Sequence, residues 1–210
     1  MNKSIKTMIA IGSIALLLAG CGGKNNDVKN NPVNENKNKT NAEVTVKNNK
    51  KSDSSVGKVD ESELARKEII KEKKNINDVI ESGPIRLTIT DIQISKVNPK
   101  PNYKSIFNDK DEVTSVVVAV EVENTSDETV SFYPDQGTVV TNTKEQKEAE
   151  IFLSDEVGGD FIGKVIKKGN IIFLLDSKAD EINNVKFVLG HPSNENFDSI
   201  GEDITLNYDI

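Results

Sequence analysis

The segment from Val113 to Asn124 is the sequence feature that most restricts the fold, because its apolar residues recur at every second position. One face is wholly apolar and the other becomes charged toward its end; the two sets are Val116, Val118, Val120, Val122 and Val117, Ala119, Glu121, Glu123. Successive side chains of a strand point to opposite faces of the sheet. The alternation therefore predicts a central strand that is buried on one side.

Further segments that alternate, or that form short apolar runs between turn signals, flank this strand. They cover residues 85–94, 129–133, 138–141, 149–153, 162–166, 170–175, 185–189 and 204–208. No helical period separates them, so about seven to nine short strands predict an all-β fold, an antiparallel β-sandwich. Residues 76–210 are long enough to form one domain with its own core. The chain has no Trp and no cysteine pair, which excludes the usual antibody-domain core.

Local signals predict how some of these strands are interrupted. The apolar alternation in 85–94 changes phase after Ile89, which predicts a β-bulge near Thr90-Asp91. Two prolines in the segment 98–101 should end that strand, since proline cannot donate to a ladder. We expect a turn at 82–84, and another at 167–169 that joins the strands 162–166 and 170–175.

The N-terminus carries a short apolar run that ends in a cysteine. Lys3 and Lys6 precede an uncharged run over residues 8–19, which is too short for the ~20 residues of a membrane-spanning helix. The run therefore predicts a secretory signal peptide. Its end, Leu18-Ala19-Gly20-Cys21, resembles the bacterial lipoprotein signal at all four positions.

This resemblance implies that residues 1–20 are removed by cleavage between Gly20 and Cys21. It also implies a diacylglyceryl group on the Cys21 thiol and, in many cases, an acyl chain on its amine. Two or more chains anchor a protein stably, so we expect it on the extracytoplasmic face of the cell membrane. The alternative is an ordinary signal peptide, but Cys21 is the only cysteine, and an exported protein would then keep one unpaired thiol.

Residues 21–60 are expected to form a disordered tether between the lipid and the folded part. Ten of the 39 residues in 22–60 are asparagine and apolar residues are few, so the segment cannot bury enough surface to offset its ordering entropy. Its net charge of +3 would suit a position near anionic lipid, or a solvated linker.

Residues 61–75 are predicted to form a short helix that leads into the domain. Asp60 and Glu63 have capping-box spacing, and the segment is rich in good helix formers. Its apolar stripe is narrow and lacks an aromatic residue. Packing of this helix on the domain and binding to a membrane surface both remain open.

The predicted β-domain, residues 76–210, is acidic. It has 25 acidic and 12 basic residues, a net charge of −13. This charge excludes nucleic acid as a partner, because nucleic-acid binding needs clusters of Lys and Arg. It also keeps the domain away from an anionic membrane surface.

Three segments of this domain resemble a bacterial family of unknown function that has an immunoglobulin-like sandwich. They are 85–94, the long strand 116–125 that closes on Asn-Thr, and 163–173, where a glycine-containing turn precedes a strand with Phe. Members of this family are commonly joined to lipoprotein signals by polar linkers, and are similar in fold to a secreted mycobacterial immunoprotective antigen. This sequence has Lys168-Gly169 where the family frequently has Pro-Gly. The resemblance implies a fold and a location but no activity.

Motifs for catalysis are absent from the sequence. The single histidine, His191, precedes Pro192 at the end of a predicted strand and is expected to be a turn residue. The chain has no G-x-S-x-G elbow, no phosphate loop and no Cys/His zinc spacing. We therefore expect a protein that is not an enzyme.

Acidic residues gather in three predicted loops: Asp109/Asp111/Glu112, Asp155/Glu156/Asp160 and Glu202/Asp203. Calcium prefers such oxygen-rich loops, although none has the EF-hand pattern. Asp155, Glu156 and Asp160 are the best candidate ligands, and no other cofactor is expected besides the lipid on Cys21. A cation- or ligand-binding accessory subunit of an envelope complex is therefore the alternative function.

Aromatic residues near predicted loop edges give a second candidate site. Tyr103, Phe107, Phe132 and Tyr133 could anchor a partner, or their rings could pack over the open end of the sandwich. The sequence favours a lipid-anchored, non-catalytic module that presents its sandwich to an envelope protein, a surface protein or another surface ligand.

Overall fold

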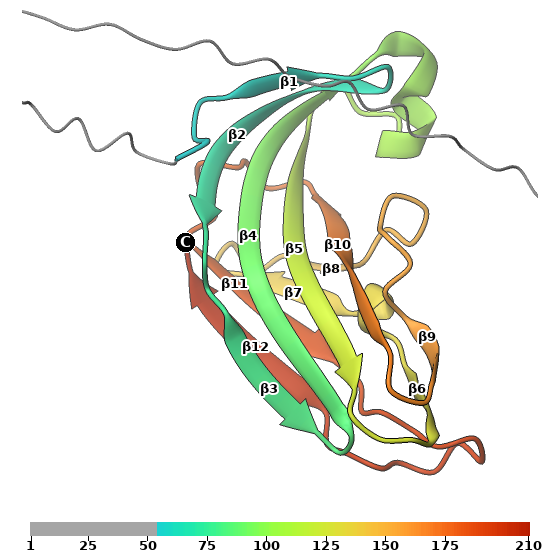
Figure 1. The fold of residues 1–210 in the computed structure, drawn as a ribbon. Coiled ribbons are helices and arrows are strands. Elements are labelled where there is room, and N and C mark those ends of the chain that lie inside the picture. The colour runs from blue at the N-terminus through green and yellow to red at the C-terminus, as the bar shows by residue number, and fades with distance from the viewer. Residues whose placement is uncertain (1–53) are drawn as a thin grey trace, which may run out of the picture. The chain divides into compact units, whose positions relative to one another are not determined.

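The structure, a computed structural model, describes residues 54–210, and the regular secondary structure of these residues is almost entirely β-strand (Figure 1). The signal peptide, Cys21 and most of the expected tether lie outside the described residues. The strands are β1 Val59–Glu61, β2 Ala65–Lys73, β3 Asp78–Ser82, β4 Ile85–Pro99, β5 Val113–Asn124, β6 Thr129–Phe132, β7 Thr138–Thr141, β8 Gln146–Glu148, β9 Gly159–Ile162, β10 Ile166–Leu175, β11 Asn184–Leu189 and β12 Ile204–Asp209.

The described strands form three antiparallel sheets. The largest has six strands in the order β1-β2-β4-β5-β10, with β3 also paired to β4. The second has the order β12-β11-β7-β8, and the third consists of β6 and β9. Two 3-10 helices, η1 (Pro101–Phe107) and η2 (Pro134–Gln136), connect strands. The all-β, antiparallel prediction is confirmed, but the predicted seven to nine strands are too few, because residues 54–210 contain twelve.

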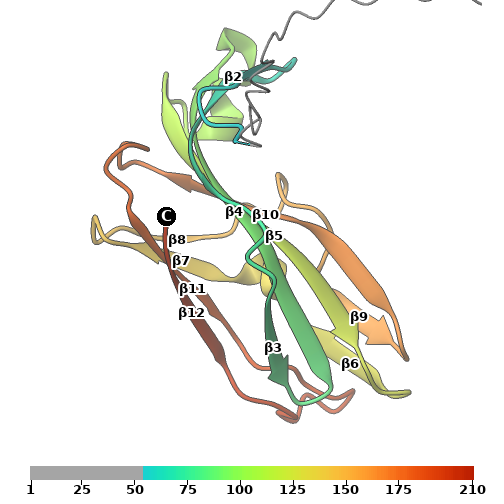
Figure 2. The same cartoon turned by 60° about the vertical axis from the view of Figure 1, so that its left-hand side comes forward.

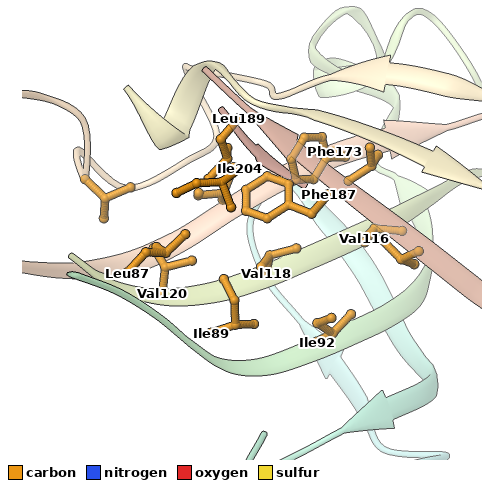
Figure 3. Packing of buried hydrophobic residues seen from close by; sticks show 14 of the residues in the cluster. Leu87, Ile89, Ile92, Val116, Val118, Val120, Phe173, Phe187, Leu189 and Ile204 are labelled. Atoms are coloured by element: carbon orange, nitrogen blue, oxygen red, sulfur yellow. The ribbon is translucent and has the colours of Figure 1, made fainter. Parts of the chain in front are cut away.

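The strand β5 lies inside the six-stranded sheet, between β4 and β10, with the bounds predicted for it. Its four alternate valines from Val116 to Val122 are at most 3% exposed. They belong to one core with residues of the four-stranded sheet, where Phe173 of β10 meets Phe187 of β11 edge to face at 5.8 Å between ring centroids (Figure 3). Each such side chain contributes about 1.5–3 kcal/mol on burial, so the two packed sheets are held by this core.

The predicted bulge in β4 is confirmed between Ile89 and Asp91. It keeps the apolar residues on either side of it, Ile89 and Ile92, on the same core-facing side. The edge partner of β4 also changes there, because β3 pairs with residues 85–89 and β2 with residues 92–99 (Figures 1 and 2). The strand ends at Pro99, as expected.

The predicted helix over 61–75 is wrong, because residues 65–73 form the strand β2. This strand is hydrogen-bonded on both sides, to β1 and to β4. Intrinsic helix propensity amounts to only tenths of a kcal/mol per residue, and two ladders of sheet pairing outweigh it. Residues 54–60, which were assigned to the tether, are also part of the fold, since the amide of Gly57 donates to the carbonyl of Ile69 at 2.8 Å.

Three further local predictions are wrong. Residues 149–153 are not a strand: 151–153 form a turn, and β8 lies just before residue 149. The turn expected at 167–169 is inside β10, where Gly169 pairs with Val120. The chain turns instead at Gly163, whose φ is +65°, and this turn divides the strand expected over 162–166, since Ile162 ends β9 and Ile166 begins β10. Gly169 serves packing, because a Cβ there would lie 2.5 Å from the Cβ of Asp155.

Candidate functional site: a groove on the outer face of the six-stranded sheet

A second apolar cluster lies on the outer face of the six-stranded sheet, the face turned away from the four-stranded sheet. Its buried members come from β2, β4, η1, β5 and β10: Ala65, Val97, Phe107, Val113 and Leu174. Val97 is three residues beyond the core residue Ile94, so their side chains point to opposite faces of β4. The sheet therefore buries both faces in this region.

A groove of about 270 Å³ opens beside this cluster, and we call it the outer groove. Its apolar lining consists of Leu64, Ala65, Val97, Phe107, Leu153, Ile172 and Leu174. Asp60, Glu61 and Lys67 are the charged residues that border it. The lining comes from β2, β4, β5 and β10, which cover three interstrand spacings, or about 14 Å. The groove is long enough for an extended apolar chain.

A second groove of about 500 Å³ adjoins the outer groove on the same face of the sheet, and we call it the polar groove. It is bordered by charged and amide side chains, Glu72, Lys74, Asp91, Gln93 and Asn170, while Ile92, Val117, Ala119 and Ile172 give it an apolar floor. Both grooves are lined by Lys67 and Ile172. Lys67 therefore stands at the boundary between the outer groove and a groove that has more charged and amide side chains at its edge.

The ammonium of Lys67 donates to Gln93 Oε1 at 3.3 Å, an oxygen that also accepts from Ser95 at 3.4 Å. Asp60 lies directly across from Lys67 on β1, but its carboxylate pairs with Lys58 at 3.0 Å. Among residues 54–210, no carboxylate forms an ion pair with Lys67. Its charge is available to a ligand.

The carboxylate of Glu72 in the polar groove has a hydrogen bond and an ion pair within the chain. The backbone amide of Ser55 donates to Oε1 at 2.5 Å, and the ammonium of Lys74 lies 3.5 Å from Oε2. Partial burial opposes ionisation, but the hydrogen bonds from Ser55 and Ser54 and the charge of Lys74 outweigh it and hold the pKa of Glu72 below its ordinary value. Glu72 is therefore a carboxylate near neutral pH.

Exposed apolar side chains adjoin the outer groove in sequence. Ile106 precedes Phe107 on η1, and Ile151 and Phe152 precede the groove residue Leu153. Phe152 is fully exposed. Exposed apolar surface beside a groove is typical of a binding site.

The structure separates the four aromatic residues that were predicted as a partner site. Phe107 is buried in the outer cluster, and Tyr103 on the same helix donates its hydroxyl to Glu63 at 2.7 Å. Phe132 belongs to the main core, and Tyr133 is about half exposed beside His191. Only Phe107 lines the outer groove.

The acidic loop residues predicted for calcium do not form a metal-binding group. Asp155 accepts hydrogen bonds from the backbone and side chain of Asn170 at 2.8 and 3.1 Å, and Asp160 accepts from Ser131 at 2.6 Å. Within residues 54–210, no three His, Cys, Asp or Glu side chains, Glu156 included, are grouped so that they could hold a metal ion. Asp155 instead ties the segment before β9 to β10.

His191 lies two residues after the end of β11, outside any strand or assigned turn, and its Nδ1 is 2.9 Å from Asp203 Oδ1. Both side chains are exposed to solvent. None of the helices in the described part of the chain has the length and apolarity that a membrane span needs.

The outer groove was not predicted, because its lining is assembled from segments that are distant in the sequence. β2 had been assigned to a helix, and Leu153 to a strand. One local signal was available: the strand 170–175 is apolar on both faces, so Ile172 and Leu174 required a second apolar environment besides the main core. The structure shows that this environment is the outer cluster.

The fold is shared with a solved structure. The crystal structure of a functionally unknown protein from Listeria monocytogenes EGD-e matches with a TM-score of 0.55 at 12% sequence identity, over 74% of this chain and 91% of that chain. At this identity the likeness shows the fold alone. No protein-family model matches the sequence.

Two proteins of Bacillus subtilis (strain 168) are similar in sequence. One is the SPbeta prophage-derived uncharacterized lipoprotein YonS, which is 26% identical over 139 residues. That match covers 65% of this chain and 63% of YonS, just under two thirds of the relative's length. The other is the uncharacterized protein YdhF, 24% identical over 193 residues, which are 83% of this chain and 81% of YdhF. The chain is thus a distant relative of an uncharacterized lipoprotein.

Proposed function

We propose that this protein is a lipid-anchored, non-catalytic binding protein of the extracytoplasmic membrane face, and that the outer groove is its ligand site. The observation that carries the proposal is the groove itself. Its lining spans four strands, about 14 Å, and is apolar on β2, β4 and β10, with Ser115 on β5 between them. A single ammonium lies at one boundary, and exposed Ile151 and Phe152 are next to the groove residue Leu153. An apolar concave surface with few polar groups is suited to hold a ligand.

The anchor is proposed at Cys21. The motif Leu18-Ala19-Gly20-Cys21 supports it, and so does the similarity to a protein named as a lipoprotein. Replacing Cys21 by Ser should move the protein from the membrane fraction to the soluble fraction. Retention of the Cys21→Ser variant in membranes would refute the lipid anchor.

For the folded part we propose an immunoglobulin-like type of sandwich. Two antiparallel sheets packed on one core support it. The β1–β2 hairpin and η1 are additions to a minimal sandwich, and both contribute residues to the outer groove. The additional elements therefore form part of the proposed site, together with β4, β5 and β10.

The ligand site is tested with Nile red, an uncharged dye that fluoresces in apolar surroundings, added to the full chain carrying Cys21→Ser. We expect saturable binding that weakens at least about tenfold in Leu153→Asp, since a carboxylate would then lie in the apolar lining. The matched control is Ile162→Asp, the same kind of change at an exposed position of β9. Equal dye binding by both variants would refute the outer groove as the site.

A further inference from the structure

We propose that the ligand of the outer groove is a single-chain monoanionic amphiphile, an alkyl chain that ends in one carboxylate, with the carboxylate at Lys67. The inference rests on the proposed function, because it names the ligand class of the same groove. It is drawn from the contrast between two adjoining grooves and from the charge at their boundary.

The apolar part of the ligand is defined by the floor of the outer groove. Ala65, Val97 and Leu174 are buried there, and Ile172 and Leu153 are partly buried beside them. The groove crosses four strands, of which β5 contributes the hydroxyl of Ser115, and the groove volume of about 270 Å³ leaves room for one chain. Each methylene removed from water contributes about 0.8 kcal/mol, so an alkyl chain of this length gains enough to bind.

The charge of the head group follows from Lys67. Its ammonium lies where the apolar lining ends, and its hydrogen bond to Gln93 at 3.3 Å is long. The nearest carboxylate across the ladder, that of Asp60, is paired with Lys58. An ammonium that is half buried and has no anionic partner favours an anionic ligand group.

The polar groove limits that group to a single negative charge. Its two carboxylates already have partners within the chain: Glu72 is bound by Ser55 and Lys74, and Asp91 accepts from the amide of Asn75 at 3.2 Å. Because Lys74 is paired with Glu72, Lys67 is the one cation of this groove without a carboxylate partner among residues 54–210, and it can neutralise one negative charge of the ligand. The amide side chains of Gln93 and Asn170 in the same groove suit a carboxylate head and its water.

The test is calorimetric titration of the full chain carrying Cys21→Ser with dodecanoate below its micelle concentration, and in parallel with dodecanol. Lys67→Gln should weaken dodecanoate binding about tenfold and leave dodecanol unchanged. Asp60→Asn should strengthen dodecanoate binding, because it removes the carboxylate across from Lys67. Lys186→Gln, an exposed lysine on β11, is the matched control and should change neither affinity.

Three other outcomes of these experiments would each contradict a different part of the proposal. Equal affinity for dodecanoate and dodecanol, unaffected by Lys67→Gln, would overturn the anionic ligand but leave the groove as the site. Binding of dodecanoate that is indifferent to Leu153→Asp would overturn the proposed function as well. Sedimentation that shows a dimer, dissociated by Leu153→Asp, would make a second copy of the chain the occupant and would overturn the amphiphile.

Discussion

The ammonium nitrogen of Lys71 lies 2.8 Å from the carbonyl oxygen of Ile182, and this hydrogen bond joins the six-stranded sheet to the turn before β11. The carbonyl of Asp180 and the side-chain oxygen of Asn183 accept from the same nitrogen at 2.9 and 2.6 Å. A bulge between Ile69 and Lys71 shifts the register of β2 by one residue. Alternate side chains beyond the bulge therefore point to the opposite face of the sheet, and Lys71 faces this turn. The same bulge leaves Lys67 on the outer face, so one irregularity links the two sheets and shapes the proposed site.

Replacing Lys71 by Met should lower the free energy of unfolding by about 1–3 kcal/mol, since three hydrogen bonds from a charged donor are lost. The measurement is urea unfolding followed by circular dichroism. Lys186→Met, at an exposed position of β11, should stay within about 0.5 kcal/mol of the parent chain. Equal stability of the two variants would show that the link contributes nothing.

Phe107 should be required for packing of η1. Its ring is buried in the outer cluster, so Phe107→Ala should cost about 3 kcal/mol or more and speed amide exchange in η1. The control Phe197→Ala removes an exposed ring from the turn before β12 and should be nearly neutral. A cost for Phe107→Ala no greater than that of the control would contradict this role.

Replacing Asn124, at the end of β5, by a charged residue should destabilise the fold. Its buried amide nitrogen donates to the carbonyls of Glu128, Phe161 and Gly163 at 2.8, 3.2 and 3.0 Å. Asn124→Asp should cost about 3 kcal/mol or more at neutral pH, because a buried carboxylate would face three carbonyl oxygens.

The cost of Asn124→Asp should also depend on pH. Burial raises the folded-state pKa of the new carboxyl, so the cost should be small below its unfolded value near 4 and grow as the pH rises through the folded value. The measurement is unfolding at several pH values, with the exposed Asn207→Asp as control. A cost that does not change with pH would contradict this environment.

The contribution of Glu72 to the free energy of unfolding should have the opposite pH dependence, growing as the pH rises from acid values. Its pKa is lowered in the folded chain, so its contribution is present above the unfolded value of about 4.3 and is lost as the pH falls through the lower folded value. The difference in unfolding free energy between the parent chain and Glu72→Gln should therefore shrink below about pH 4. The exposed Glu195→Gln should show no such trend, and a pH-independent difference for Glu72→Gln would refute the assignment.

The strands that bury one face were predictable from the sequence. β5 has the bounds that its alternating valines indicate, and the bulge of β4 lies at the phase change after Ile89. These patterns report burial of one face, which is a local property of the sequence. The same reasoning located β11 and β12, whose alternate residues enter the main core.

The strand β2 and the outer groove were not predictable in this way. β2 carries alternating charges and good helix formers, and only its pairing with β1 and β4 makes it a strand. Lys67 and Ile172 lie about a hundred residues apart in the sequence, yet they line the same boundary. No local period encodes such a contact, because it arises from the order of strands in the sheet.

The most direct test of the ligand site is nuclear magnetic resonance of the full chain carrying Cys21→Ser during titration with dodecanoate. The account predicts that chemical shifts change for the methyl groups of Val97, Ile172 and Leu174, while those of the main-core residues Val185 and Ile204 stay fixed. Shift changes elsewhere with these three methyl groups unaffected would contradict the outer groove as the binding site.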